Sequence, residues 1–226
     1  FRGNGYSIRG LAIGGKRSTA GLFLKIGETG EIYDLNVSGN IQPGGDCEAV
    51  GGIAAVNEGL IQNCSFSGSV SGRLNTGGIA GTNAAGNRIR DCSVSGSMEG
   101  ARQTGGIAGY STGIIEDCTN TSVIGYPHVS YNTGGIAGSI AIEYELDPED
   151  DVSASLSGEY RRQYEYRAVV QQCANTGAVS AKRSNTGGIA ASTRYGFGML
   201  ANITLQVENN PNFEVLTEPY LSLIHI

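Results

Sequence analysis

Five cysteines and two histidines are the side chains in this sequence best suited to nucleophilic or metal chemistry. No two cysteines form a Cys-x-x-Cys pair, which argues against a zinc site. Because an unoxidised cysteine buries readily, we expect the cysteines that recur after an apolar pair to fill one column inside the fold. These are Cys64, Cys92, Cys118 and Cys173. Cys47 lies outside the series, and we expect a free thiol in a loop.

His128 is the histidine that a catalytic triad would have to use, since His225 lies in a tail unrelated to the rest of the chain. It follows Tyr126-Pro127, a turn-like stretch, so we expect an exposed loop residue. We expect neither a nucleophile elbow nor a His-Glu-x-x-His zinc site. The sequence therefore predicts no catalytic residue, no metal and no cofactor.

Aspartates at one recurring position raise the alternative of polysaccharide cleavage. Asp91 and Asp117 occupy the same place in adjacent repeats, and stacked parallel strands would hold their carboxylates about 5 Å apart. Retaining glycosidases hold two carboxyl groups at about 5–5.5 Å. Asn63 and Gln172 take this place in other repeats, which is typical of a turn column. A polysaccharide-active enzyme, either a lyase or a glycoside hydrolase, stays the alternative to a non-catalytic module.

A glycine-rich hexapeptide organises all of these positions. Thr-Gly-Gly-Ile-Ala-Gly stands at 76–81, 104–109 and 133–138, with near-copies at 50–55 and 186–191. The Gly-Gly pairs follow one another after 26, 28, 29 and 53 residues. We expect three short strands and three corners per coil, with Gly-Gly supplying positive φ and letting the coils approach closely. This predicts an all-β solenoid, a right-handed parallel β-helix of about six coils with one inserted loop.

Further positions recur with the hexapeptide and predict the interior. One apolar column comprises Ile32, Ile61, Ile89, Ile115 and Val170, and a second comprises Leu35 and the four recurring cysteines. Between the two columns stand Asp34, Asn63, Asp91, Asp117 and Gln172. Asp and Asn tolerate left-handed backbone, so these positions are expected to be corners. One coil cannot bury its apolar face alone, but stacked coils share a continuous narrow core.

The step of 53 residues contains an excursion at 143–167 that interrupts the repeat. It holds eight acidic residues and three arginines, and so most of the chain's net charge of −6. Because insertions in solenoids often form the binding face, we expect the partner-binding residues here. They are Tyr144, Asp147, Glu149, Asp150, Asp151, Tyr160, Arg161, Arg162, Tyr164 and Tyr166. The acidic run at 147–151 offers oxygen ligands for calcium but lacks the Asp-x-Asp-x-Asp-Gly spacing, which favours a solvated loop.

Composition narrows the class of protein further. A pI of about 5.0 argues against nucleic acid as the partner. No apolar run approaches the roughly 18 residues of a membrane-spanning helix. We predict a repeat domain at 1–208, a linker or the start of a further segment at 209–220, and a sequencing-adapter scar at 221–226. Phe1 already lies within the pattern and no signal peptide precedes it, so we expect a fragment.

The hexapeptide repeat resembles the GLUG motif, a short glycine-rich repeat of bacterial secreted and cell-surface proteins. The N-terminal stretch is similar to the lead-in of such arrays at Phe1, Gly3, Asn4, Gly5, Ile8, Gly10, Leu11, Gly21, Leu22, Phe23, Gly30, Ile32, Leu35 and Gly39. The resemblance covers residues 1–192 apart from the excursion. It implies a right-handed parallel β-helix in an adhesin-like protein, or in the accessory region of an immunoglobulin-A-cleaving metallopeptidase.

The resemblance and the lack of catalytic spacing favour a non-catalytic bacterial module, either secreted or on the cell surface. Its expected role is adhesion or spacing. The expected partner is a glycan or protein of a host or cell surface, bound through the 143–167 excursion.

Overall fold

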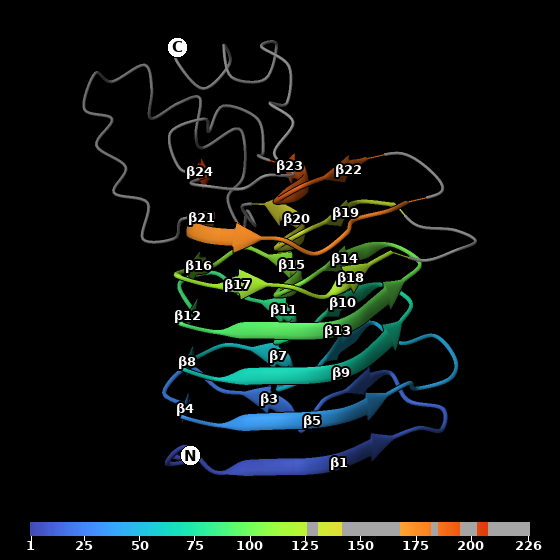
Figure 1. The fold of residues 1–226 in the computed structure, drawn as a ribbon, viewed down its shortest axis with the longest axis vertical. Helices are drawn as coiled ribbons and strands as arrows, with labels where there is room; N and C mark the ends of the chain where they lie inside the picture. Colours follow the sequence, from blue (N-terminus) through green and yellow to red (C-terminus); the bar gives the residue numbers. More distant parts are fainter. Residues whose placement is uncertain (126–130, 142–167, 182–184, 195–202, 208–226) are drawn as a thin grey trace, which may run out of the picture.

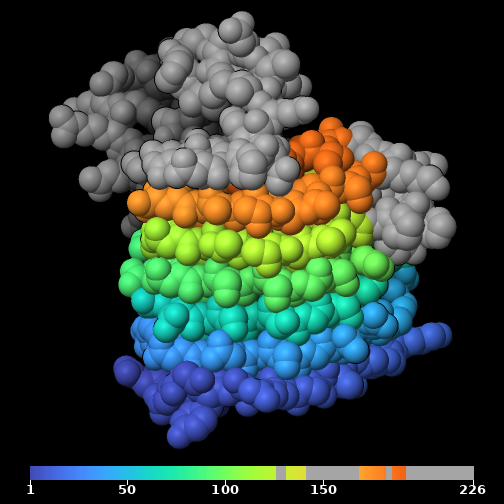
Figure 2. All heavy atoms as spheres, in the orientation of Figure 1, coloured from blue at the N-terminus to red at the C-terminus, as the bar shows by residue number. Residues whose placement is uncertain are grey.

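The computed structural model describes residues 1–125, 131–141, 168–181, 185–194 and 203–207. These residues form β-strands and no helix, and the strands wind into a solenoid of about five turns. Figure 1 shows the coils stacked along the long axis, and each coil forms one band of the space-filling view in Figure 2. Strands of successive coils pair in parallel. The predicted β-solenoid is confirmed.

The strands form four stacks, two of which belong to one continuous sheet. The first stack comprises β4 (Glu31–Tyr33), β8 (Leu60–Gln62), β12 (Arg88–Arg90), β16 (Ile114–Glu116), β21 (Ala168–Asn175) and β24 (Ile203–Val207). The second comprises β1 (Ser7–Ile13), β5 (Asn36–Ile41), β9 (Ser65–Gly72), β13 (Ser93–Gly100), β17 (Thr119–Asn120) and β18 (Val123–Ile124). Strand β21 pairs with both β16 and β17, and so joins the two stacks.

The other two stacks are separate sheets of six strands each. The third stack comprises β2 (Thr19–Ala20), β6 (Ala49–Gly51), β10 (Asn75–Gly77), β14 (Gln103–Gly105), β19 (Thr133–Gly134) and β22 (Thr186–Gly187). The fourth comprises β3 (Phe23–Ile26), β7 (Ala54–Asn57), β11 (Ala80–Asn83), β15 (Ala108–Ser111), β20 (Ala137–Ala141) and β23 (Ala190–Arg194). A complete turn thus has four strands, where the sequence predicted three.

The fourth strand exists because the hexapeptide bends in its middle. In one coil, β10 ends at Gly77 and β11 begins at Ala80. A Cβ on Gly77 would lie 2.1 Å from the carbonyl oxygen of Ala80, so a larger residue could not make this bend. A Cβ on Gly78 would lie 2.4 Å from both Gly106 O and Val94 Cγ1. The Gly-Gly pair therefore permits close approach, as predicted. The positive φ predicted for it is wrong, because neither glycine has one.

Left-handed backbone occurs instead at the corner between the first and second stacks. The residues that hold it are Asp34, Asn63, Asp91, Asp117 and Gln172, with φ between 51° and 54°. These are the residues predicted to form a corner column. Asn and Asp adopt this conformation more readily than most residues, because their short polar side chains can hydrogen-bond locally.

The core is one continuous apolar cluster running along the solenoid axis. The isoleucine column and the cysteine column both point inward, as predicted. A third inward column is the isoleucine of the hexapeptide: Ile53, Ile79, Ile107, Ile136 and Ile189, each at most 1% exposed. Each residue packs on its counterparts in the coils before and after, so the core has no natural boundary along the axis.

Amide side chains also lie inside the solenoid, which the sequence did not indicate. In the fourth stack, Asn57 Nδ2 donates to Asn83 Oδ1 at 2.8 Å, and Asn83 Nδ2 donates to Ser111 Oγ at 3.1 Å. In the second stack, Asn120 Nδ2 donates to Asn175 Oδ1 at 2.8 Å. All five side chains are fully buried. Because an unpaired buried amide is costly, these residues occur as stacked ladders.

Candidate functional site

The ten residues predicted to bind a partner lie between 142 and 167, outside the described residues. The acidic run considered for calcium and the loop residue His128 also lie outside them. The segments at 209–220, predicted as a linker, and at 221–226, predicted as an adapter scar, also lie outside the described residues. All of these remain predictions, and the candidate site is built from the described coils.

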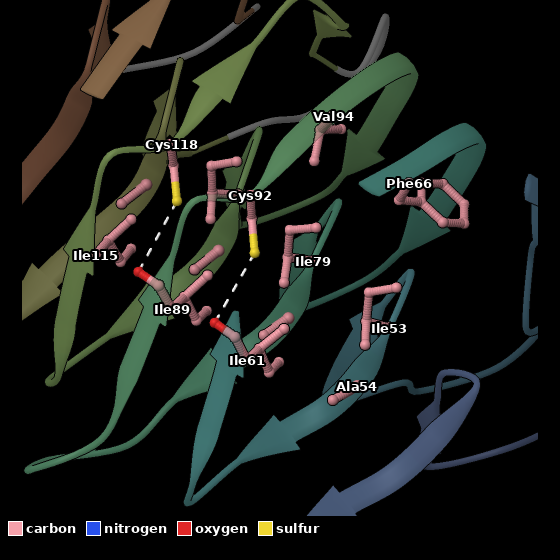
Figure 3. Packing of buried hydrophobic residues seen from close by; sticks show 14 of the residues in the cluster. Ile53, Ala54, Ile61, Phe66, Ile79, Ile89, Cys92, Val94, Ile115 and Cys118 are labelled. Atoms are coloured by element: carbon pink, nitrogen blue, oxygen red, sulfur yellow. Dashed lines mark hydrogen bonds between the residues drawn. The ribbon is translucent and has the colours of Figure 1, made fainter. Parts of the chain in front are cut away.

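The cysteine column is structural. Each of its thiols lies within hydrogen-bond distance of one carbonyl oxygen of its own coil and of one in the coil before. Figure 3 shows the contacts with the coil before, from Cys92 to Ile61 O and from Cys118 to Ile89 O. Cys118 Sγ lies 3.1 Å from Glu116 O and 3.8 Å from Ile89 O. All five cysteines are free. Burial raises the pKa of the Cys118 thiol well above its usual value, which disfavours the nucleophilic thiolate.

Cys47 is a free thiol in a loop outside the column, as predicted, and it is also fully buried. Its Sγ donates to Arg17 O at 2.6 Å, and burial raises the pKa of the thiol. The loop that carries it folds inward against the third stack, where the small apolar thiol fills space. Within the described coils, no three His, Cys, Asp or Glu side chains gather to hold a metal ion.

Ser111 stands in a Gly-x-Ser-x-Gly pattern at 109–113, which the sequence reading passed over. The pattern marks a nucleophile elbow where a strand turns sharply into a helix and exposes the serine. Here Ser111 ends strand β15 and is fully buried. Its hydroxyl accepts from Asn83 and donates to Gly113 O at 3.3 Å. This serine belongs to a core ladder.

Asp91 and Asp117 are exposed corner residues on adjacent coils. The Asp91 carboxylate accepts from Gln62 Nε2 at 3.3 Å and lies 3.4 Å from Arg90 Nε. One coil away, Asn63 Nδ2 donates to Asp34 Oδ1 at 2.6 Å in the equivalent position. Both carboxylates and amides occupy this one left-handed backbone position, which is what a corner requires. Neither aspartate lines a described groove, so the geometry gives the glycosidase hypothesis no support.

A first groove crosses the outer face of the first stack and has a volume of about 380 Å³. Its rim carries both signs of charge, Glu28 and Glu31 on one side and Arg88 and Arg90 on the other. Arg88 is held by Glu116, with Nη1 2.7 Å from Oε1. The other oxygen of Glu116 accepts from Gln171 Nε2 at 2.8 Å. This arginine is therefore engaged in bridging coils of the scaffold.

A second groove, of about 420 Å³, lies on the third stack and spans three coils. Two columns of different side chains line it: Leu74, Arg102 and Tyr131 in one, Asn75, Gln103 and Asn132 in the other. Arg102 makes no ion pair with any described residue, and Tyr131 is 37% exposed. The groove thus presents a cation, an aromatic ring and several amides. We take it as the candidate binding site.

Sequence reasoning missed the second groove, although a signal was present. The residue two places before each hexapeptide threonine or valine changes from coil to coil, through Glu48, Leu74, Arg102 and Tyr131. The hexapeptide beside it hardly changes. The repeated scaffold places these variable positions side by side. A solenoid can therefore adapt this part of its surface to a particular ligand.

The comparisons with known proteins agree with the repeat architecture. One family, described as the GLUG motif, matches residues 46–71, which run from the loop before β6 through most of β9. No curated protein and no solved structure matches the chain. The described coils contain no helix long and apolar enough to cross a membrane. The match places a GLUG motif within the β-solenoid at 46–71, which is consistent with the resemblance to GLUG-motif repeat proteins seen in the sequence.

Proposed function

We propose that this chain is a non-catalytic module of a bacterial surface or secreted protein, with a role in adhesion or spacing. The observation that carries the proposal is the contrast between the inward column of the hexapeptide, which is constant, and an outward column beside it, which varies. The hexapeptide isoleucines are buried and identical in five coils, from Ile53 to Ile189. The outward column from Glu48 to Tyr131 has a different side chain in every coil.

A constant inward column and a variable outward column suit a rigid scaffold that presents binding side chains on its outer face. Backbone hydrogen bonds join each coil to the next, and the apolar cluster runs through all of them, which makes a stiff rod. The cysteines, the serine at 111 and the corner aspartates all have structural roles in this rod. We therefore assign partner contact to the side chains of the outward grooves, and the 143–167 excursion remains a predicted contact.

One assay separates binding from catalysis. The full chain is mixed with neutral and anionic polysaccharides; retention is measured by affinity electrophoresis, and cleavage by the release of reducing ends. Retention without new reducing ends is the expected result. New reducing ends that disappear in Asp117→Ala would overturn the proposal and favour a polysaccharide-active enzyme.

The same retention assay tests the excursion. Deleting 143–167 is expected to weaken retention while leaving the β-rich circular dichroism spectrum unchanged, because the repeat resumes directly after it at β21. Full retention by the deleted chain would reject the excursion as the contact and leave the grooves.

A further inference from the structure

We infer that the groove on the third stack binds an acidic saccharide, through the carboxylate and one ring face of a single sugar residue. The inference rests on the proposed binding function and names the ligand class. It concerns the residues at 74–75, 102–103 and 131–132, which three successive coils bring to one place.

The arginine supplies the charge selectivity. Arg102 lies between β13 and β14 with an exposed side chain, and no described carboxylate neutralises it. The other groove differs in this respect, because its Arg88 is engaged by Glu116. A guanidinium that is not held by the scaffold can offer its planar pair of N–H groups to a ligand carboxylate.

The tyrosine supplies the apolar surface that a sugar ring needs. Tyr131 follows Arg102 in the same column, one coil further on, since Gln103 and Asn132 directly precede the paired Thr104 and Thr133. Coils stack at about 4.8 Å, so the ring and the guanidinium lie within the width of one sugar residue. An exposed aromatic ring with a polar edge suits a ligand that has an apolar face and polar groups around it.

The amide column supplies hydroxyl recognition. Asn75, Gln103 and Asn132 run parallel to the first column on the same groove. Asn75 Nδ2 donates to Thr82 Oγ1 at 3.3 Å, while its Oδ1 is shielded from water and has no donor among the described residues. An unpaired acceptor is costly, and rotating this amide toward the groove would let it accept from a sugar hydroxyl. Amides are both donors and acceptors, as hydroxyl groups also are.

The test compares acidic and neutral saccharides on matched variants by isothermal titration calorimetry. The probes are sialyllactose, a galacturonate trisaccharide and lactose, so that the two acidic probes separate a sialic acid from a uronic acid source. The full chain is expected to bind one of the acidic probes at least tenfold more tightly than lactose. Equal affinity for lactose, or binding of no acidic probe, would overturn the inference.

The variants locate the contact. Arg102→Gln is expected to weaken binding of the acidic probe at least tenfold, and Tyr131→Ala to weaken it severalfold, while Tyr131→Phe keeps the ring and most of the affinity. Arg9→Gln and Tyr6→Ala make matched changes at exposed positions in the N-terminal coil. If all five variants bind like the unaltered chain, the groove is not the site. Polysaccharide retention that persists in Arg102→Gln would refute this inference alone and leave the proposed function in place.

Discussion

The second stack contains two different interiors on one inward column. In the N-terminal coils the column is apolar, with Val37, Phe66 and Val94 aligned in register. In the later coils Asn120 and Asn175 take the same positions. The backbone differs too, because β9 and β13 each run for eight residues, whereas the next coil breaks into β17 and β18.

The break and the amide belong together. Between β17 and β18, the amide of Asn120 accepts from Ser122 N at 3.0 Å and donates to Ser122 O at 3.3 Å. These bonds satisfy backbone groups that lie outside the two short strands. The register aligns Ser122 with Gly96 and Gly68, glycines with φ of 110° and 149° that allow the longer strands. A residue with a side chain disfavours a positive φ, so the strand breaks at Ser122. The side-chain amide of Asn120 then makes the hydrogen bonds to Ser122 that a continuous strand would have made.

We call the coils with Val37, Phe66 and Val94 the apolar half of the second stack, and those with Asn120 and Asn175 its polar half. Placing an amide in the apolar half should lower stability more than any other change considered. In Phe66→Asn the lost ring costs about 3–5 kcal/mol of unfolding free energy, and the unpaired amide adds about 1–3 kcal/mol. Phe66 is 1% exposed, and its neighbours in the column are valines that cannot pair with an amide. A large fall in the urea midpoint is therefore expected. Ser93→Asn, at an exposed position of the adjacent strand, is the control and should change stability by less than about 0.5 kcal/mol.

Replacing the amides of the polar half by valine should reveal their coupling. Asn120→Val removes one of the two donors to Asn175 Oδ1 and leaves Ser122 N without its acceptor, at a cost of about 2–3 kcal/mol. Asn175→Val should cost a similar amount, because Gly177 N loses its acceptor. The double variant should be less destabilised than the sum of the two by about 0.5–3 kcal/mol, since the bond between the two side chains is lost only once. Additive losses in chemical denaturation would show that the ladder bond contributes nothing.

The sequence predicted the features that every coil must share. The isoleucine column, the cysteine column and the left-handed corner repeat because each is a strict geometric requirement of a stacked coil. The number of strands was predicted wrongly, because the bend at Gly78 and Ile79 lies inside a hexapeptide that reads as one strand.

The features that change between coils were harder to predict. Asn120 is of a residue type that is usually exposed, so its residue type argues against placing it inside. Its position two residues after Cys118 was the available signal, since Val94 stands two residues after Cys92. The groove at Arg102 and Tyr131 was not predicted because it also depends on how the coils align. Its residues come from three coils, and only the register brings them together.

The second glycine of the hexapeptide lies against the inward column of the second stack. Substituting it in different coils therefore compares how tightly the apolar and the amide-containing coils are packed. A Cβ on Gly78 would meet Val94 Cγ1 at 2.4 Å, and a Cβ on Gly106 would meet Asn120 Cγ at 2.3 Å. Backbone oxygens of the next coil lie equally close to both. Gly78→Ala and Gly106→Ala should therefore each lose about 1–3 kcal/mol, typical of overpacking.

Thermal unfolding of the two glycine variants beside Gly14→Ala provides the measurement. Gly14 has nothing within 4 Å of an added Cβ, so this control should match the unaltered chain or be slightly more stable. Loss of stability confined to Gly78→Ala would mean that the coils with Asn120 and Asn175 are loosely packed and can accommodate the added methyl group.

The smallest effects are expected at the corner, and they test how far the difference between the two halves extends. Asp91 precedes the apolar coil position Val94, and Asp117 precedes Asn120, yet their φ values are 52° and 53°. If the halves differ only within the second stack, Asp91→Ala and Asp117→Ala should each cost about 1–2 kcal/mol, the penalty of left-handed backbone for an ordinary residue. Asp→Asn at either corner should cost much less, because Asn63 already occupies the same conformation. A clear difference between the two alanine variants in urea denaturation would place the change of interior at the corner itself.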